Sequence, residues 1–120
     1  SMPAHQQIPE MTVVGHNTAT IRESLLEKAF ELGEKFITAS KEHYDPGIIG
    51  PFCLQTCIDK DMDYYIYDVA PRLGGGTNVH VNVGHPYGNA TWRKSMSSGR
   101  RIAMEIRQAV EQDRLDEVLT

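Results

Sequence analysis

The sequence has few cysteines, few aromatic residues and no long apolar run. Of its 120 residues, 2 are cysteine, 1 is tryptophan and 8 % are aromatic. No apolar run approaches the roughly 20 residues that span a bilayer, so no membrane partner is expected. A formal net charge of −4 does not suggest a nucleic-acid surface. With 40 % hydrophobic and 23 % charged residues, the chain has the composition of one ordinary globular domain.

The two cysteines are expected to be free thiols. On a strand, Cys53 and Cys57 would lie roughly 13 Å apart, whereas a disulfide needs Cα atoms within about 7 Å. The flanking sequence offers no two further ligands in a zinc spacing, so a zinc site is disfavoured. Free thiols are typical of a reducing compartment, and a cytoplasmic location is expected.

The hydrophobic pattern predicts a single α+β domain at 3–120, with an antiparallel sheet and helices packed on one face, in the order β-α-β-β-(β)-α. Ser1 and Met2 are interpreted as a remnant of expression. The expected elements are an irregular lead-in at 3–10, a strand at 11–15, a helix at 21–43 with a Thr20–Glu23 capping box and a stop at 45–47, strands at 52–58 and 64–70, a further strand at 78–83, a helix at 97–113 and a short turn or strand at 115–120.

The two middle strands predict a hairpin that aligns two polar side chains. The polar cluster 59–63 is turn-like, and a hairpin centred between Asp61 and Met62 places Gln55 opposite Asp68. Directly opposed side chains project on the same face with Cβ atoms about 5 Å apart, a spacing that suits two oxygen ligands of one magnesium ion. A register slip of one residue would send them to opposite faces.

The residues after Asp68 favour a phosphate site. Pro71 and Arg72 follow at fixed distance, and three glycines at 74–76 then let backbone approach a ligand closely. A guanidinium can hold phosphate oxygens while the carboxylate holds a cation. An isolated aspartate at a strand end is often only a solvated edge residue, and the attached residues are what favour a ligand.

Other polar residues have simpler interpretations. His80 and His85 fit surface or structural roles better than a metal or acid–base site, and His16 fits a loop. Trp92 fits an anchor for a loop or a subunit contact. The basic pair 100–101 at a helix start suits either a phosphate contact or a solvated face.

Four segments carry a resemblance to a known family: Ile21–Leu26 (IRESLL), Gly50–Leu54 (GPFCL), Ala70–Asn78 (APRLGGGTN) and Met96–Ala103 (MSSGRRIA). In this order, over about 12–120, they resemble the archaeal PurP family, the formate-dependent synthetases of 5-formaminoimidazole-4-carboxamide ribonucleotide. The hairpin and its Pro-Arg pair also look like the carboxy-terminal half of ATP-grasp ligases.

The resemblance implies a purine-biosynthetic (IMP-forming) ligase that uses ATP to convert formate to an acyl phosphate, which the amine of aminoimidazole carboxamide ribonucleotide then attacks. It implies Gln55 and Asp68 as ligands of Mg²⁺ or Mn²⁺ and Arg72 as the catalytic residue on the transferred phosphoryl group. The implied substrate-side residues are Arg22, Glu23, Ser24, Gly74, Gly75, Gly76, Thr77 and Asn78.

The chain departs from the ATP-grasp pattern at three positions. A carboxylate is usual where Gln55 stands, glutamate where Asp68 stands and asparagine where Ala70 stands. The lysines and glycine-rich flap that such enzymes use to hold nucleotide are not in the 120 residues, so a carboxy-terminal portion that is inactive without its amino-terminal domains is expected. A homo-oligomer is implied. The alternative is a non-catalytic ligand-binding or assembly module derived from such a ligase.

Overall fold

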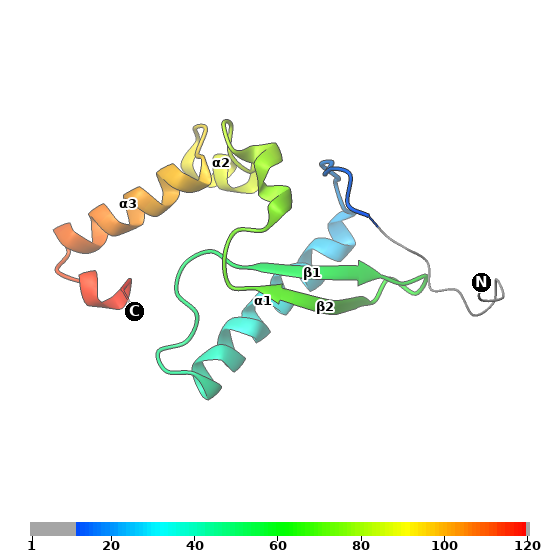
Figure 1. Cartoon of the computed structure of the whole chain (residues 1–120), viewed down its shortest axis with the longest axis horizontal. Helices are drawn as coiled ribbons and strands as arrows, with labels where there is room; N and C mark the ends of the chain where they lie inside the picture. Colours follow the sequence, from blue (N-terminus) through cyan, green and yellow to red (C-terminus); the bar gives the residue numbers. More distant parts are fainter. Residues whose placement is uncertain (1–11, 120) are drawn as a thin grey trace.

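The computed structural model describes residues 12–119 as a β-hairpin, three α-helices and two short 3₁₀ helices (Figure 1). The α+β class is confirmed. The expression remnant expected at 1–2, the lead-in at 3–10 and Met11 of the first expected strand lie outside the described residues.

The first helix, α1 (Glu23–His43), follows the spacing of apolar residues predicted for it and begins two positions later than predicted. The Thr20–Glu23 capping box is wrong, because Arg22 precedes the helix in extended backbone and no side chain caps it. At the other end, the Tyr44 N–H donates to the Ser40 carbonyl at 2.9 Å, and the chain then turns as predicted.

The hairpin consists of β1 (Cys53–Ile58) and β2 (Tyr64–Ala70), both of which lie within the predicted spans. Asp59 organises the turn, since its Oδ1 accepts from the N–H groups of Asp61 and Asp63, each at 2.9 Å. The hydrogen bond from Asp63 is the main cause of a lowered pKa at Asp59. A carboxylate therefore fixes where the chain reverses.

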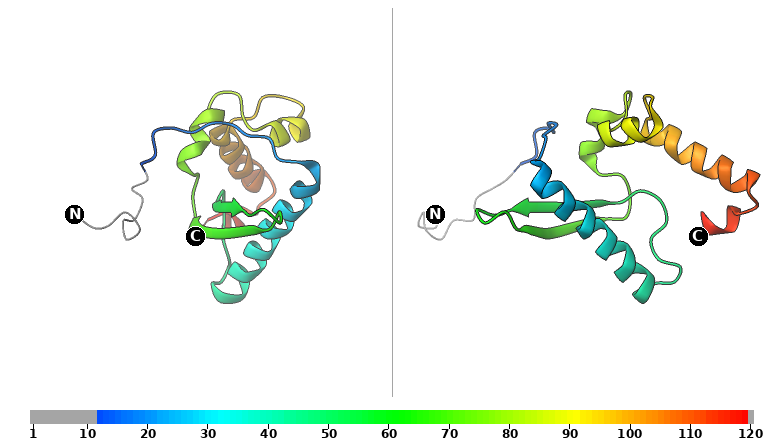
Figure 2. Two further views of the ribbon diagram at one scale, coloured as in Figure 1. Left: turned by 90° about the vertical axis from the view of Figure 1, so that its right-hand side faces the viewer. Right: turned by 180° about the vertical axis from the view of Figure 1, so that it is seen from behind.

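One face of the hairpin is covered by α1, as Figure 2 shows. The rings of Phe36 and Phe52 lie 5.0 Å apart, and the Tyr64 hydroxyl donates to the Leu25 carbonyl at 3.0 Å. Because side chains alternate along a strand, the opposite face carries Cys53 and the residues that share its side.

The strands predicted at 11–15 and 78–83 are wrong in the part that the structure describes, since 12–15 and 78–83 contain no strand. The chain from Gly75 to His80 forms a 3₁₀ helix, η2, and its backbone groups are used locally. The Val81 N–H donates to the Asn78 carbonyl at 3.4 Å and the Gly84 N–H to the His80 carbonyl at 2.9 Å. These bonds replace a third sheet ladder.

The second half forms an arm of two helices set off from the hairpin (Figure 1). The first, α2 (Pro86–Trp92), was not predicted, because its proline and glycine suggested a loop, yet proline is favoured at a first helical position. The second, α3 (Ser98–Glu111), matches the prediction, and the Ser97 hydroxyl accepts from the Arg100 N–H at 3.2 Å. The tail forms a 3₁₀ turn, η3 (Leu115–Glu117). The last helix was expected to pack on the same face of the sheet as the first. That expectation is wrong, because α3 lies away from the hairpin (Figure 1).

One asparagine closes the loop that joins η2 to α3. The Asn89 side chain accepts from the Met96 N–H at 2.8 Å and donates to the Val83 carbonyl at 2.7 Å. Gly84 and Met96 form an isolated parallel bridge. Gly84 has φ of 78°, and a Cβ there would lie 2.2 Å from the Met96 carbonyl oxygen, so only glycine fits.

The described part of the chain buries little apolar surface. Its buried hydrophobic side chains are Leu25, Ala70, Met96 and Ala109. The radius of gyration is 17.9 Å, with extents of 63 × 34 × 31 Å, against about 14 Å for a compact domain of this length. Within 12–119, no helix combines the length and apolarity needed to cross a membrane.

Candidate functional site

The predicted pairing of Gln55 with Asp68 is confirmed. The two residues are register partners, and the Gln55 Nε2 donates to the Asp68 Oδ2 at 2.9 Å. They lie on the hairpin face away from α1, because Phe52, an odd number of positions before Gln55 and therefore on the other side of the strand, packs against Phe36 of α1. The hairpin therefore presents an amide and a carboxylate side by side, away from its covering helix.

A β-bulge produces this pairing. Near the turn, Thr56 pairs with Ile66, which would continue to a pair between Gln55 and Tyr67. Instead the register shifts, Tyr67 has no partner in the ladder and Asp68 comes opposite Gln55. The sequence prediction placed the turn centre half a residue too far along the chain and did not include the bulge, and the two errors cancelled.

The pair fits a hard cation only in part. Asp68 supplies carboxylate oxygens, and the Gln55 carbonyl oxygen would become a second ligand if the amide turned over. In the arrangement described, the amide donates to the carboxylate, so its N–H group occupies the position that a metal would take. Among residues 12–119, no three His, Cys, Asp or Glu side chains gather to hold a metal. Further ligands would have to come from outside these side chains.

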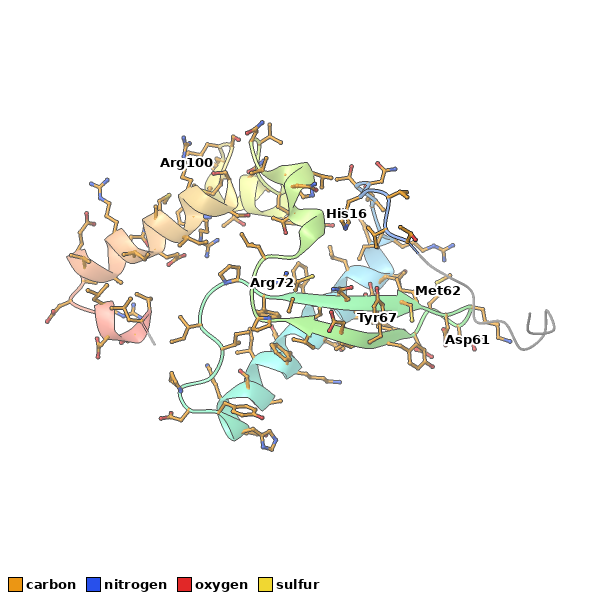
Figure 3. All side chains as sticks on the ribbon, in the orientation of Figure 1. His16, Asp61, Met62, Tyr67, Arg72 and Arg100 are labelled. Atoms are coloured by element: carbon orange, nitrogen blue, oxygen red, sulfur yellow. The ribbon has the colours of Figure 1, made fainter. Side chains whose placement is uncertain are left out.

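Arg72 lies just beyond β2 in the exposed turn labelled in Figure 3. Its Nη1 donates to the Leu73 carbonyl at 2.9 Å. A guanidinium has five N–H donors, so this bond fixes the side chain near its own turn and leaves most of the planar fork for an anion.

The glycine turn reaches back onto the face that carries the Gln55–Asp68 pair. A Cβ on Gly74 would lie 2.9 Å from the Cys53 Sγ, so the turn passes closely over β1. Cys53 is two positions before Gln55 and therefore shares its face. The structure thus places the start of the glycine turn against Cys53, on the hairpin face that carries the pair.

His16 contacts the same turn and was missed as a site residue. Its imidazole packs against Gly75 and Gly76: a Cβ on Gly76 would lie 3.2 Å from the His16 Cδ2, and one on Gly75 3.6 Å from its Cε1 (Figure 3). Two adjacent residues without side chains leave room for a ring, but nothing in the sequence indicates which ring. Thr77 and Asn78 continue η2 beyond this contact.

The predicted substrate-side residues around position 22 lie at the start of α1. Arg22, Glu23 and Ser24 are exposed at the start of the helix. In the described part of the chain, no hydrogen bond or ion pair joins them to Gln55, Asp68 or Arg72. The segment that carries His16 leads directly into them, so their link to the glycine turn is through the backbone.

Two histidines form a second polar cluster beside α2. The rings of His80 and His85 lie 5.1 Å apart, and that of Tyr87 lies 5.2 Å from His85. The His85 Nδ1 accepts from the Tyr87 N–H at 3.3 Å and so caps α2. Burial lowers the pKa of His85, and the neighbouring His80 lowers it further. The cap requires the neutral ring that this environment favours.

A family profile described as a domain of unknown function, DUF1297, matches residues 1–120. Relatives named as 5-formaminoimidazole-4-carboxamide-1-(beta)-D-ribofuranosyl 5'-monophosphate synthetases are 39 % identical in Methanobrevibacter smithii, over 99 % of this chain and 34 % of the relative, and 42 % identical in Sulfurisphaera tokodaii, over 99 % and 36 %. A similar protein from Saccharolobus solfataricus, with the same name, is 45 % identical over 93 % of this chain and 33 % of the relative.

The arrangement of the chain also recurs in a solved structure. A crystal structure described as an IMP biosynthesis protein PurP from Thermococcus kodakaraensis matches with a TM-score of 0.78 and 37 % identity, over 98 % of this chain and 39 % of that chain. This chain therefore spans about a third of the length of the curated relatives it matches.

Proposed function

The chain belongs to the PurP family of archaeal proteins and contains a DUF1297 domain, and from this premise we propose that it is the carboxy-terminal ATP-grasp portion of an ATP- and formate-dependent ligase. The reaction formylates aminoimidazole carboxamide ribonucleotide in IMP biosynthesis. The relatives are named as synthetases of the formylated product, which supports this reaction class. The proposed portion covers residues 3–120 as one domain.

The observation that carries the proposal is the contact between Gln55 and Asp68 on the uncovered hairpin face. The Gln55 amide donates to the exposed Asp68 carboxylate at 2.9 Å, which holds the two side chains together in the absence of a cation. When Mg²⁺ or Mn²⁺ binds with ATP, we expect the amide to turn over and offer its carbonyl oxygen instead. The metal would neutralise phosphate charge as the γ-phosphoryl group is transferred.

In the proposed reaction, a formate oxygen attacks the γ-phosphorus of ATP, and ADP leaves. The substrate amine then attacks the carbonyl carbon of formyl phosphate, and phosphate leaves. Arg72 would hold the transferred phosphoryl group through the donors that its bond to Leu73 does not use. Gly75, Gly76 and Thr77 would line the side from which the amine approaches, and Asn78 would extend that wall.

Residues at the start of α1 would close the substrate side. Arg22 supplies a cation for the ribonucleotide phosphate, and Glu23 and Ser24 supply polar groups for the ring or ribose. The contact of His16 with Gly75 and Gly76 supports this grouping, because it holds the segment before α1 against the glycine turn.

We propose that the 120 residues alone have no ligase turnover. The relatives are about three times as long as the part matched here, so most of a nucleotide site would come from other segments. The described residues also lack a three-ligand metal cluster. A longer polypeptide that carries this domain is therefore the species to assay, with ATP, formate and aminoimidazole carboxamide ribonucleotide.

The test is formate-dependent ADP release by the full-length protein with two substitutions. Asp68→Asn removes the charged metal ligand, and Arg72→Ala removes the phosphate fork; each is expected to lower kcat by about 100-fold or more. Asp61→Asn, in the exposed turn at the far end of the hairpin, is the matched control and should leave the rate unchanged. Turnover like wild type in both site variants would contradict the assignment.

A second candidate is a non-catalytic ligand-binding or assembly module derived from such a ligase. It is favoured by one observation, that glutamine and alanine stand at positions 55 and 70, where ATP-grasp ligases usually carry a carboxylate and an asparagine. The assay above separates the two, because a module would show no formate-dependent ADP release even in the wild-type full-length protein.

A further inference from the structure

His16 lies with its imidazole ring against the glycine turn (Figure 3). Among the described residues, and apart from the turn's own chain neighbours, the only atoms within 4 Å of a Cβ placed on Gly75 belong to this ring. The three atoms nearest to a Cβ placed on Gly76 belong to it as well, the closest being Cδ2 at 3.2 Å. The ring therefore lies where side chains of these two residues would otherwise extend.

The nitrogens of this ring are available for chemistry. His16 is exposed, and within residues 12–119 no hydrogen bond or ion pair engages either nitrogen. Its Nε2 lies 3.9 Å from the Cβ positions of both glycines. His85 differs, because its Nδ1 accepts from the Tyr87 N–H at 3.3 Å, and protonation of that nitrogen would break the cap of α2. His16 can accept a proton without losing such a contact.

The glycine turn connects His16 to the hairpin face that carries the Gln55–Asp68 pair. The turn approaches that face at Gly74, where a Cβ would lie 2.9 Å from the Cys53 Sγ. Gly76, which contacts His16, follows two residues later, a step of at most about 7 Å along the chain. One short turn thus has the polar pair near its beginning and a free imidazole against its next two residues.

We propose that His16 accepts the proton that the substrate amine loses in the second step of the reaction. This inference rests on the proposed function, in which Gly75 and Gly76 line the side from which the amine approaches. The amine nitrogen bonds to the carbonyl carbon of formyl phosphate, and the bond from that carbon to the phosphate oxygen breaks. One proton passes from the nitrogen to His16, which then gives it to the leaving phosphate. No oxidant or reductant is needed.

The chemistry of the amine explains why a proton acceptor would help. An amine on an aromatic ring is a weak nucleophile, because its lone pair is delocalised into the ring. If its proton leaves as the new C–N bond forms, no cationic nitrogen has to build up. Imidazole suits this role, since it is the side chain whose charge ordinarily changes between pH 5 and 8.

Other ionisable side chains belong to the elements that meet His16. They are His80 in η2, Arg72 just before the glycine turn, and Arg22 and Glu23 at the start of α1. All of them remain when His16 alone is replaced. A pH effect that disappears with His16 therefore originates in its own imidazole.

The test follows the two chemical steps separately in the full-length protein. In ATP that carries heavy oxygen between the β- and γ-phosphorus atoms, formate-dependent scrambling of the label reports phosphoryl transfer, whereas formylated ribonucleotide reports transfer to the amine. His16→Asn should leave scrambling within about 2-fold of wild type and lower product formation by about 100-fold or more. His43→Asn, exposed at the other end of α1, is the matched control and should change neither.

Two further readouts distinguish a proton acceptor from a structural contact. Product formation by the wild-type protein should fall as the pH decreases through the range in which an imidazole takes up a proton, and His16→Asn should lack this fall. Imidazole added to His16→Ala should restore part of the lost rate, because the small molecule can occupy the place of the missing ring.

Equal slowing of both steps in His16→Asn would overturn the proposal, because it would leave the ring a structural role only. Wild-type product formation in that variant, or an unchanged pH profile without rescue by imidazole, would overturn it too. A wild-type protein with neither scrambling nor product would refute the proposed function and this inference together. Normal turnover of the wild type beside an unaffected His16 variant would refute this inference alone.

Discussion

The hairpin with α1 and the arm of α2 and α3 are organised in different ways. The hairpin has a backbone ladder, a turn fixed by Asp59 and an aromatic contact to α1 between Phe36 and Phe52. The arm is tied together by the hydrogen bonds of Asn89 and by the tight turn at Gly84, and it meets α1 in an edge-to-face contact, with the rings of Phe30 and Tyr87 6.2 Å apart. The first region therefore has a backbone ladder as well as side-chain contacts between elements, whereas the arm makes few contacts with α1 in the part of the chain that the structure describes.

The largest loss of stability is expected from a substitution at the base of the arm. Gly84→Ala would force a side chain onto φ of 78° and into the Met96 carbonyl oxygen, 2.2 Å from its Cβ. We expect a loss of about 3–5 kcal/mol in the free energy of unfolding, measured by urea denaturation. Gly99→Ala, in the first turn of α3 with open space around it, is the control and should gain up to about 1 kcal/mol. Equal effects would show that the clamp does not hold the arm.

The contact between α1 and the hairpin should contribute more to the free energy of unfolding than the contact between α1 and the arm. Phe36→Ala removes the ring that lies 5.0 Å from Phe52 and is expected to cost about 2–3 kcal/mol. Phe30→Ala removes a ring that is 58 % exposed and should cost about 1 kcal/mol or less. Thermal unfolding of both variants gives the comparison, and a reversed order would show that the arm, not the hairpin, is the better-anchored region.

Adding a charge to the Gln55–Asp68 pair tests whether it binds a cation. Gln55→Glu places two carboxylates where a hydrogen bond of 2.9 Å now stands, and we expect a loss of about 1 kcal/mol at neutral pH without metal. Because Mg²⁺ would bridge the two groups, millimolar Mg²⁺ should restore the Tm. Gln55→Met is the control, since it loses the bond without adding charge and should not respond to Mg²⁺. A variant indifferent to Mg²⁺ would argue against a cation site.

The smallest expected effect is a pH dependence of the stability that arises from His85 in the arm. Burial holds the pKa of His85 below its ordinary 6.5, so the unfolded chain takes up the proton first as the pH falls. The stabilising contribution is complete above about pH 6.5 and is lost as the pH falls from there through the lowered pKa. His85→Asn keeps a cap for α2 without titrating and should flatten this part of the Tm–pH curve. An unchanged curve would exclude His85 as the cause.

The sequence predicted the hairpin and the two long helices because each depends on short-range patterns. Alternation defines β1 and β2, and the spacing of apolar residues defines α1 and α3. The strand expected at 78–83 failed because local turn bonds from Gly84 to His80 compete with a ladder that had no partner strand. The helix α2 was missed because its proline lies at a first helical position, where it promotes a helix.

The candidate site was predictable only in part for the same reason. Symmetry about the turn placed Gln55 opposite Asp68, although the bulge at Tyr67 that produces this register leaves no clear sequence signal. The contact of His16 with Gly75 and Gly76 joins residues about sixty positions apart, and no periodicity encodes it. The metal, phosphate and substrate roles of the site residues stay predictions.

The most direct test is a crystal structure of the full-length protein with Mn²⁺ and a non-hydrolysable ATP analogue, using the anomalous signal of the metal. We predict an anomalous peak about 2.1 Å from an Asp68 carboxylate oxygen, with the Gln55 amide turned so that its carbonyl oxygen faces the metal. Metal bound elsewhere, with the hydrogen bond from Gln55 to Asp68 intact, would contradict the account.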